Sequence, residues 1–257
     1  MKLFMIKKTF FDMWDNLLKI VILNLGFILV SAIFLIVPYL HKFNIIWGLL
    51  GFFLSFIIFN IYYGTVSLFV LKIADYESAG FNDFFLYFKK SWKISILYSL
   101  SLILFMTIII FVIPFYSRLN NYLGFFISFL FLWGTLIFFL SIQYFYQIYG
   151  RFNNSFFKVI KKCLLVLFDN TGFSIYLVFV GIIIIILSLI TGFIFPGIST
   201  FLLWQSVGLK LRLYKYDYLE ENPDANRKKI PWDILLENDK EMVGKRTLKG
   251  MIFPWKE

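Results

Sequence analysis

The chain has almost none of the residues that build disulfides and histidine-based metal sites. Its 257 residues include one cysteine, Cys163, and one histidine, His41. A single cysteine excludes an internal disulfide, and a single histidine excludes a cluster of histidine ligands. Charged residues make up 16% of the chain, whereas roughly 25% is usual in soluble domains. We therefore expect no metal and no cofactor, and lipid rather than water around most of the chain.

Charge is absent from five long windows, and these windows predict membrane-spanning helices, since about 20 apolar residues cross a roughly 30 Å hydrocarbon core. The fifth window, 170–209, is too long for one helix and is interrupted by Gly192 and Pro196, so we divide it. The predicted fold is all-α and polytopic, with a membrane domain over 1–214 and a cytoplasmic tail over 215–257. A re-entrant hairpin is the competing interpretation of the last segment. The six predicted spans are approximately 20–40, 45–71, 94–115, 122–147, 171–191 and 198–214.

The basic residues predict the orientation of the chain. All but two of the 25 lysine and arginine residues, Lys42 and Arg118, fall on one side of the predicted spans. This bias places both termini in the cytoplasm of a bacterial cell, with the chain in the inner membrane. The net charge of +10 then faces an anionic leaflet, and no aromatic-basic motif indicates a nucleic-acid partner.

Three phenylalanine pairs indicate an internal repeat, because they lie 74 and 72 residues apart. Each pair opens a short amphipathic stretch and a spanning helix that closes near a proline. We interpret this as three tandem helical hairpins, each preceded by a cytoplasmic interfacial helix. Chance alignment in a chain with 35 Phe is the alternative. The pairs and prolines are Phe10-Phe11 with Pro38, Phe84-Phe85 with Pro114, and Phe156-Phe157 with Pro196.

The amphipathic stretches predict aromatic faces that lie in the lipid headgroups. In the first stretch, Lys8 and Asp12 oppose the aromatic face and are expected to point away from the membrane. The alternative is that these stretches extend the spans and pack on neighbouring helices. Cys163 falls on the apolar face of the third stretch, so we expect it to be packed. The candidate membrane-interface residues are Phe10, Trp14, Phe81, Phe84, Phe85, Phe88, Trp92 and Phe156.

Ionisable residues are missing from the middle of every predicted span before Lys210, which argues against a carboxylate-relay transporter. Lys210 and Arg212 are expected to snorkel to the interface from the end of the last span. No protease-type catalytic set and no nucleotide-binding motif occurs, so the chain is not expected to be an enzyme. Polar residues within the spans, such as Asn24, are expected to form hydrogen bonds between helices, or, in the returning spans, to form a polar pathway. The candidate pathway residues are Asn60, Gln143 and Gln205.

The tail differs from the rest of the chain in being polar and mixed in charge. Pro231 and Gly244 predict the limits of a short helix. Its apolar side is expected to consist of Ile234, Leu235 and Met242. Such a tail folds back on the bilayer, binds a protein partner, or is simply solvated. The candidate binding residues of the tail are Trp232, Lys245, Arg246, Phe253 and Trp255.

Two stretches share a layout in which a span is followed by an aromatic and basic segment. The first runs from Tyr63-Gly64-Thr65 to Phe84–Lys93, and the second from Tyr144–Arg151 to Asp169-Asn170-Thr171. This layout resembles the YesL-like family of bacterial integral membrane proteins of unknown function, over roughly residues 10–215. The chain departs from the family at Pro38-Tyr39-Leu40-His41, where the family tends to have Pro-x-x-Thr-x-Gly. The resemblance implies a multi-span protein that accompanies carbohydrate uptake, and it transfers no catalytic residue.

Two functions are consistent with these features. The first is a non-catalytic accessory or scaffold subunit that acts through protein or lipid binding, for example beside a transport system. The second is a channel, transporter or lipid translocator with a pathway between the three hairpins.

Overall fold

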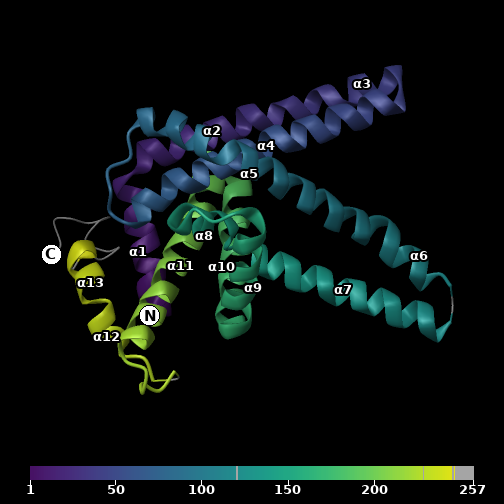
Figure 1. Cartoon of the computed structure of the whole chain (residues 1–257). Coiled ribbons are helices and arrows are strands. Elements are labelled where there is room, and N and C mark those ends of the chain that lie inside the picture. Colours follow the sequence, from purple (N-terminus) through teal and green to yellow (C-terminus); the bar gives the residue numbers. More distant parts are fainter. Residues whose placement is uncertain (120, 228, 245, 247–257) are drawn as a thin grey trace.

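The computed structural model describes residues 1–119, 121–227, 229–244 and 246, apart from the side chain of Phe81, and all regular structure in them is helical (Figure 1). A 3₁₀ segment, Ile33–Ile36, joins α2 to α3, and a π segment, Ile108–Val112, joins α5 to α6. The helices are α1 Lys2–Asp15, α2 Leu17–Ala32, α3 Val37–Phe43, α4 Ile45–Ala74, α5 Phe81–Thr107, α6 Ile113–Ser117, α7 Tyr122–Ile142, α8 Phe145–Phe152, α9 Phe156–Asp169, α10 Thr171–Ile190, α11 Gly197–Glu221, α12 Trp232–Leu235 and α13 Glu237–Val243.

Five helical segments of the described residues are long and apolar enough to cross a membrane, which confirms the all-α membrane class. They contain or overlap the first five predicted spans. The sixth predicted span, 198–214, lies in α11, which is not among these five. The five segments are Leu17–Phe43, Ile45–Ala74, Asn82–Ser117, Tyr122–Ile142 and Thr171–Ile190.

Two prolines that were expected to close spanning helices instead begin new helical segments. Pro38 lies in the first turn of α3, and Pro114 in the first turn of α6. A first-turn proline loses no intrahelical hydrogen bond, because its missing N–H would have had no partner there. The preceding 3₁₀ and π segments change the helix register, so the first and third spans continue to Phe43 and Ser117.

Asparagine caps begin the two returning helices of the hairpins. The Asn44 side chain accepts a hydrogen bond from the Ile46 N–H at 2.9 Å. The Asn121 side chain accepts one from the Gly124 N–H at 2.6 Å. Each cap satisfies a backbone donor that the helix itself cannot, and so defines where α4 and α7 start.

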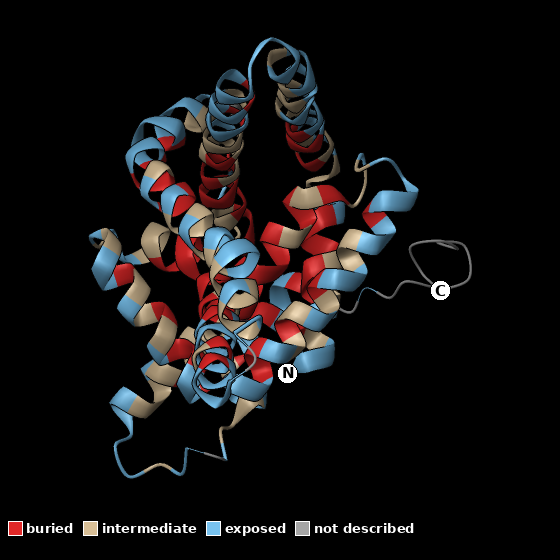
Figure 2. Ribbon diagram, turned by 90° about the vertical axis from the view of Figure 1, so that its right-hand side faces the viewer, coloured by how far each residue is buried: buried red, intermediate tan, exposed pale blue. Residues whose placement is uncertain are grey.

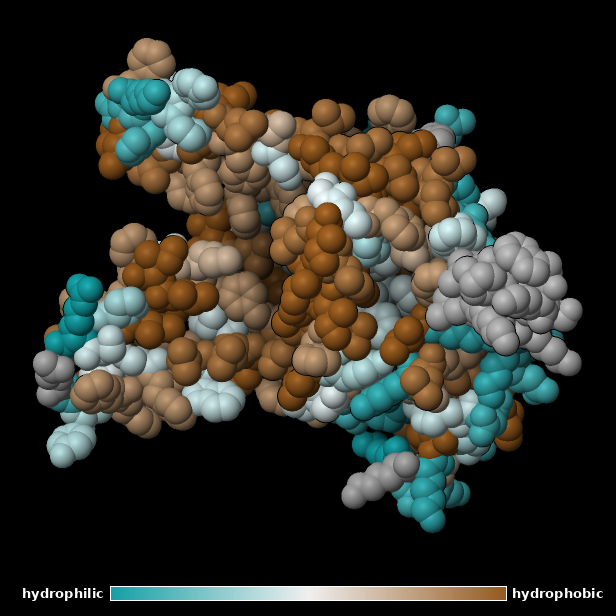
Figure 3. Space-filling view, turned by 180° about the vertical axis from the view of Figure 1, so that it is seen from behind, coloured by the Kyte–Doolittle hydropathy of each residue, from teal (hydrophilic) through white to brown (hydrophobic). Residues whose placement is uncertain are grey.

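The first two hairpins, α2–α4 and α5–α7, diverge from a common base like two arms (Figure 1). We use "base" for the region where α1, α8, α9, α12 and α13 meet the ends of α4, α5 and α11. Buried residues gather where the helices converge, and the far ends of the hairpins are exposed (Figure 2). The arms are hydrophobic on their surface and leave an open wedge between them (Figure 3). Surfaces of this kind suit lipid rather than water.

Helix α11 is the buried centre of the molecule. It packs against α1, α2, α4, α8 and α10. Small residues such as Ser199, Ser206 and Gly208 are buried along it and let the neighbouring helices approach closely. Burial by protein, rather than contact with lipid, explains why this helix is less apolar than the five membrane-length segments.

The three amphipathic stretches adopt two different arrangements. Helix α1 is separated from α2 at Asn16, and α9 from α10 at Asn170, so the first and third are separate helices. The second stretch is continuous with its span in α5. There the alternative interpretation, an extension of the span, describes the structure.

Asn24 attaches the turn between α10 and α11 to α2. Its Nδ2 donates to the carbonyls of Ile194 at 3.1 Å and Pro196 at 2.7 Å. Its Oδ1 accepts from the Ser199 N–H at 2.9 Å. Gly197 has φ +73°, and a Cβ at that position would overlap the Asn24 amide. Asn24 therefore forms the hydrogen bonds between helices that were expected of polar residues in the spans.

We expect Gly197→Ala to destabilise the protein more than Gly192→Ala. Gly192 has φ +62° and open space around it, so both variants share left-handed strain of about 1–2 kcal/mol. Only Gly197→Ala displaces Asn24 and its three hydrogen bonds, worth about 1 kcal/mol each. Its unfolding midpoint should lie roughly 6–12 °C below that of Gly192→Ala.

Labelling of Cys163 by a thiol-reactive fluorophore during heating measures this midpoint. Cys163 is the only cysteine and is fully buried, so it reacts when the fold opens. Equal midpoints for the two variants would show that the Asn24 contact does not stabilise the turn.

Candidate functional site

Helix α1 is oriented with its charged side toward the protein and its aromatic side outward. Lys8 is 0% exposed and Asp12 is 6% exposed, so both side chains are packed inside the protein rather than in water. Trp14 is exposed and stacks on Phe10, with ring centroids 6.2 Å apart. The charged side of α1 therefore contributes to the interior of the base.

The ammonium groups of Lys8 and Lys210 both lie close to the Tyr76 ring. The Nζ of Lys8 is 3.5 Å from the ring centroid and the Nζ of Lys210 is 4.5 Å from it. Lys8 also bonds Asp12 Oδ2 at 2.7 Å. Tyr76 follows α4 with φ +61°, a left-handed conformation that is strained for an aromatic residue. The two ammonium groups hold the ring in this position through cation–π attraction.

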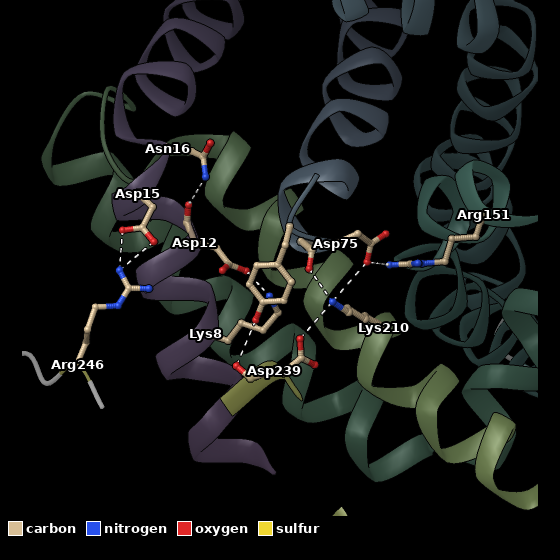
Figure 4. A network of polar contacts seen from close by, with 11 residues as sticks. Lys8, Asp12, Asp15, Asn16, Asp75, Arg151, Lys210, Asp239 and Arg246 are labelled. Carbon is tan, nitrogen blue, oxygen red and sulfur yellow. Dashed lines mark hydrogen bonds and ion pairs between the residues drawn. The ribbon is translucent and has the colours of Figure 1, made fainter. Parts of the chain in front are cut away.

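Lys210 connects α11 to α4 and to the tail helix α13. Its Nζ donates to the Ala74 carbonyl at 3.1 Å and to Asp239 Oδ1 at 3.2 Å, and lies 3.7 Å from Asp75 Oδ1 (Figure 4). Arg151 of α8 bonds the same Asp75 oxygen at 2.8 Å. Lys210 is buried at 8% exposure, so the prediction that it snorkels to the interface is wrong. We call Lys8, Asp12, Asp75, Tyr76, Arg151, Lys210 and Asp239 the base cluster.

Burial and opposite charges set the protonation of the base cluster. Burial raises the pKa of Asp12 to about 6, although Lys8 acts in the opposite direction. Burial lowers the pKa of Lys8, although Asp12 opposes this. Burial and the Asp239 carboxylate raise the pKa of Tyr76, so its hydroxyl stays protonated and donates to the Asp239 carbonyl at 3.4 Å. At neutral pH the Asp12 carboxyl is therefore mostly ionised.

The tail is docked on the base, and its buried side differs from the predicted one. Leu236, Asp239 and Val243 are buried, whereas Ile234 and Met242, expected on the apolar side, are 70% and 60% exposed. The predicted single helix is two short ones, α12 and α13, which meet at Leu236. Gly244, with φ +70°, ends α13 as expected.

Two of the five candidate tail residues contact the base. The Trp232 ring lies 5.5 Å from the Arg212 guanidinium carbon. Arg246 Nη1 bonds both Asp15 carboxylate oxygens, at 2.8 and 2.9 Å (Figure 4). The other three, Lys245, Phe253 and Trp255, lie outside the described residues.

Of the remaining candidate membrane-interface residues, some have exposed side chains and others pack against the protein. Phe85, Phe88 and Trp92 are exposed on α5. Phe84 is half-buried with its ring 5.8 Å from that of Tyr62. Phe156 of α9 turns inward, with its ring 5.5 Å from that of Phe145. The apolar side of α9 around Phe156 thus packs on protein. The last candidate, Phe81 of α5, has a side chain that lies outside the described part of the structure.

Gln143 and Gln205, two of the three candidate pathway residues, line one cavity between α4, α5, α7, α10 and α11. Asn60 does not line it, and its Nδ2 donates to the Phe56 carbonyl of its own helix at 2.8 Å. Gln147, which sequence analysis did not single out, joins the pair by donating from Nε2 to Gln205 Oε1 at 3.3 Å. Gln147 is the last residue of the predicted span 122–147, and its place on the short helix α8 gave no signal of this role.

The base cluster also contains residues that sequence analysis did not select. Asp75 and Tyr76 lie in the turn after α4, Arg151 in α8 and Asp239 in α13, and only folding brings these three segments to Lys210. Their one common signal is that each is a polar residue near the end of an apolar helix or in the tail. As an arrangement of paired charges, the cluster is suited to holding segments together.

Metal-ligating side chains are not clustered among the described residues. No group of three His, Cys, Asp or Glu there could hold a metal ion. Cys163 is fully buried, and burial raises its thiol pKa, so the expectation that it is packed is confirmed.

No family model, no curated protein and no solved structure matches this chain. The YesL-like resemblance therefore stays a prediction.

We expect Asp12→Asn to remove a pH dependence of stability. The pKa of Asp12 is about 6 in the fold against 3.8 as its ordinary value, so folding takes up a proton between about pH 4 and 6. This contribution to the unfolding free energy is present below pH 4 and is lost as pH rises through 6, by about 3 kcal/mol. The difference between the Cys163-labelling midpoints of wild type and variant at pH 4, 5, 6 and 7 measures it.

Glu241→Gln, an exposed carboxyl on α13, serves as the control and should follow the wild type at each pH. A constant difference between wild type and Asp12→Asn across this range would contradict the role of burial at Asp12.

Proposed function

We propose that this chain is a non-catalytic multi-span protein of the bacterial inner membrane, an accessory or scaffold subunit that acts by binding. In this proposal α11 is the sixth span, the spans form three tandem hairpins, and both termini face the cytoplasm. The distribution of charge supports this orientation. Lys42 lies at the far end of one arm and Arg118 at the far end of the other. Three of the remaining basic residues, Lys8, Arg151 and Lys210, belong to the base cluster at the opposite end of the molecule. The outward aromatic residues of α1 and α5 would then rest in the cytoplasmic leaflet.

One observation favours a protein partner at the tail. Asp239 and Leu236 hold α12 and α13 against the base, while Ile234 and Met242 remain exposed on the same two helices. A docked segment loses little conformational entropy on binding, which favours affinity. Exposed apolar side chains on such a segment are the groups that a partner would bury.

We expect the double variant Ile234→Ser, Met242→Ser to lose a protein partner that wild type retains. Full-length tagged protein, crosslinked in cells and purified, would be compared by mass spectrometry. Because the two exposed side chains are replaced and the Lys210–Asp239 contact is left intact, the fold should be unaffected. At least one neighbour should fall by about tenfold, as expected for loss of about 1.4 kcal/mol.

Glu237→Gln on the same helix is the matched control and should keep that neighbour. Identical neighbour lists for wild type and the double variant would remove the tail from the proposal. Normal Cys163 protection in both variants would show that they are folded.

A channel, transporter or lipid translocator is the second candidate, favoured by the cavity that Gln143 and Gln205 share. If it is correct, liposomes containing the protein should move ions, solutes or labelled lipid across the bilayer faster than empty liposomes. Gln143→Leu should slow this movement, because it removes an amide from the cavity lining, whereas Thr107→Val should not. Thr107 bonds the Ile103 carbonyl of its own helix and does not line the cavity. Rates equal to those of empty liposomes would eliminate this candidate.

A further inference from the structure

One pattern, Phe-Phe-x-x-x-Lys-Lys, occurs in both α5 and α9. It runs from Phe84 to Lys90 in α5 and from Phe156 to Lys162 in α9, 72 residues further along the chain. The corresponding run of α1 begins at Phe10 and has Asp15 and Asn16 in place of the two lysines. Two of the three amphipathic stretches therefore carry a pair of cations at the same position.

The fold gives the two phenylalanine pairs the same orientation. The first member of each pair, Phe84 or Phe156, is half-buried with its ring beside another aromatic ring. The second member is at the surface, with Phe85 71% exposed and Phe157 83% exposed. In α1 the second member, Phe11, is only 2% exposed. The runs of α5 and α9 are thus equivalent in structure as well as in sequence, and the run of α1 is not.

The lysines lie next to these exposed phenylalanines. The first lysine of each run follows the exposed phenylalanine by four residues, which places both on the same side of the helix. Lys89, Lys90 and Lys161 are exposed. Lys162 is half-buried, and its Nζ lies 3.8 Å from the centroid of the Phe152 ring. Each run therefore presents an aromatic side chain and cations together at the surface.

These four lysines form no ion pair with a described carboxylate. The chain has no aspartate or glutamate between Asp83 and Asp169, so sequence neighbours supply no opposite charge. Those two carboxylates already face other lysines: Asp83 lies 3.9 Å from Lys72, and Asp169 lies 2.7 Å from Lys215. The counter-charge for both runs must therefore come from outside the described part of the chain, and an anion is the complementary ligand.

Both runs lie where a membrane-length helix would meet the lipid headgroups. Lys90 is four residues before Ile94, where a charge-free run begins, so it lies about 6 Å outside that run along the helix. The headgroup layer on each side of the hydrocarbon core is about 5–8 Å thick. The run of α9 precedes the span Thr171–Ile190, and Phe168 of α9 is exposed as well. Exposed aromatic residues beside lysines are typical of helices that rest in the headgroup region.

We propose that each of the two runs binds an anionic phospholipid, with the lysine pair at the headgroup phosphate and the exposed phenylalanine against the upper part of an acyl chain. A zwitterionic phospholipid carries its own cation beside the phosphate and gains less from the lysines. Each lysine near an anionic lipid surface contributes roughly fivefold in affinity. The proposal rests on the proposed function in placing the base at a membrane surface, and it names the class of lipid bound there.

Photolabelling of the full-length protein in lipid nanodiscs tests both sites. The probe is phosphatidylglycerol with a photoreactive group at the headgroup end of one acyl chain, and the reference probe is phosphatidylcholine with the same chains. We expect phosphatidylglycerol to label 84–90 and 156–162 roughly fivefold more than phosphatidylcholine does, or better, and to show no such preference at 10–16 of α1. Excess unlabelled phosphatidylglycerol should compete for this labelling, and inorganic phosphate, which has no acyl chain, should not.

Two double variants serve as matched controls for each other, because each removes two positive charges from one run only. Lys89→Gln with Lys90→Gln should abolish the preference for phosphatidylglycerol at 84–90 and preserve it at 156–162. Lys161→Gln with Lys162→Gln should have the reciprocal effect. Protection of Cys163 identifies variants that remain folded. If one variant does not fold, the other variant and the comparison of the two probes on wild type decide.

Three results would overturn the proposal. They are equal labelling of both runs by the two probes, an equal preference for phosphatidylglycerol at 10–16, and a preference that neither double variant changes. The last two would identify a general attraction of a basic protein to an anionic bilayer. Because the nanodiscs contain no partner protein, any of these results would leave the accessory-subunit proposal to its own test by crosslinking in cells.

Discussion

The Lys210 ammonium is the contact on which the arrangement of the base depends. It lies on the most enclosed helix and is satisfied by the Ala74 carbonyl, Asp239 and Asp75. A buried ammonium is stable only when such partners replace its water, and removing one partner of a buried pair costs about 3–5 kcal/mol. The end of α4, the centre of α11 and the tail helix α13 are therefore held together by contacts to the Lys210 ammonium. Through Asp75 it also includes Arg151 of α8.

The base is buried by protein, whereas protein covers little of the two arms. In the five membrane-length segments only 11–28% of the most apolar window is buried by protein, so lipid must cover the remainder. Inside a bilayer the hydrophobic effect does not bring helices together, and hydrogen bonds and close packing take its place. Asn24 and the Gln143 and Gln147 amides provide such bonds. The ends of the arms have few of them, and there the hairpins diverge (Figure 1).

The amphipathic periods predicted which residues share one side of a helix, but they did not predict whether that side contacts protein or lipid. In α1 the period correctly separated Phe10 and Trp14 from Lys8 and Asp12, but the charged side faces protein. In α9 the apolar side, with Phe156, packs inward. A helical period states which residues share a side, and the neighbouring helices decide what each side contacts. In α13 the buried stripe includes Asp239, because its partner Lys210 is buried as well, and no hydrophobicity pattern could have selected it.

The sequence by itself determined the membrane class, the helical fold and the positions of five spans, because long charge-free runs can satisfy their backbone in lipid only as helices. Its Lys and Arg distribution also predicted an orientation. Only the tertiary structure decided where the charged and amide residues meet. Lys8, Asp75, Lys210 and Asp239 converge from four distant segments, and Gln143 and Gln205 reach one cavity from different helices. Local periodicity contains no information on such convergence, since it arises from packing between helices that are far apart in the chain.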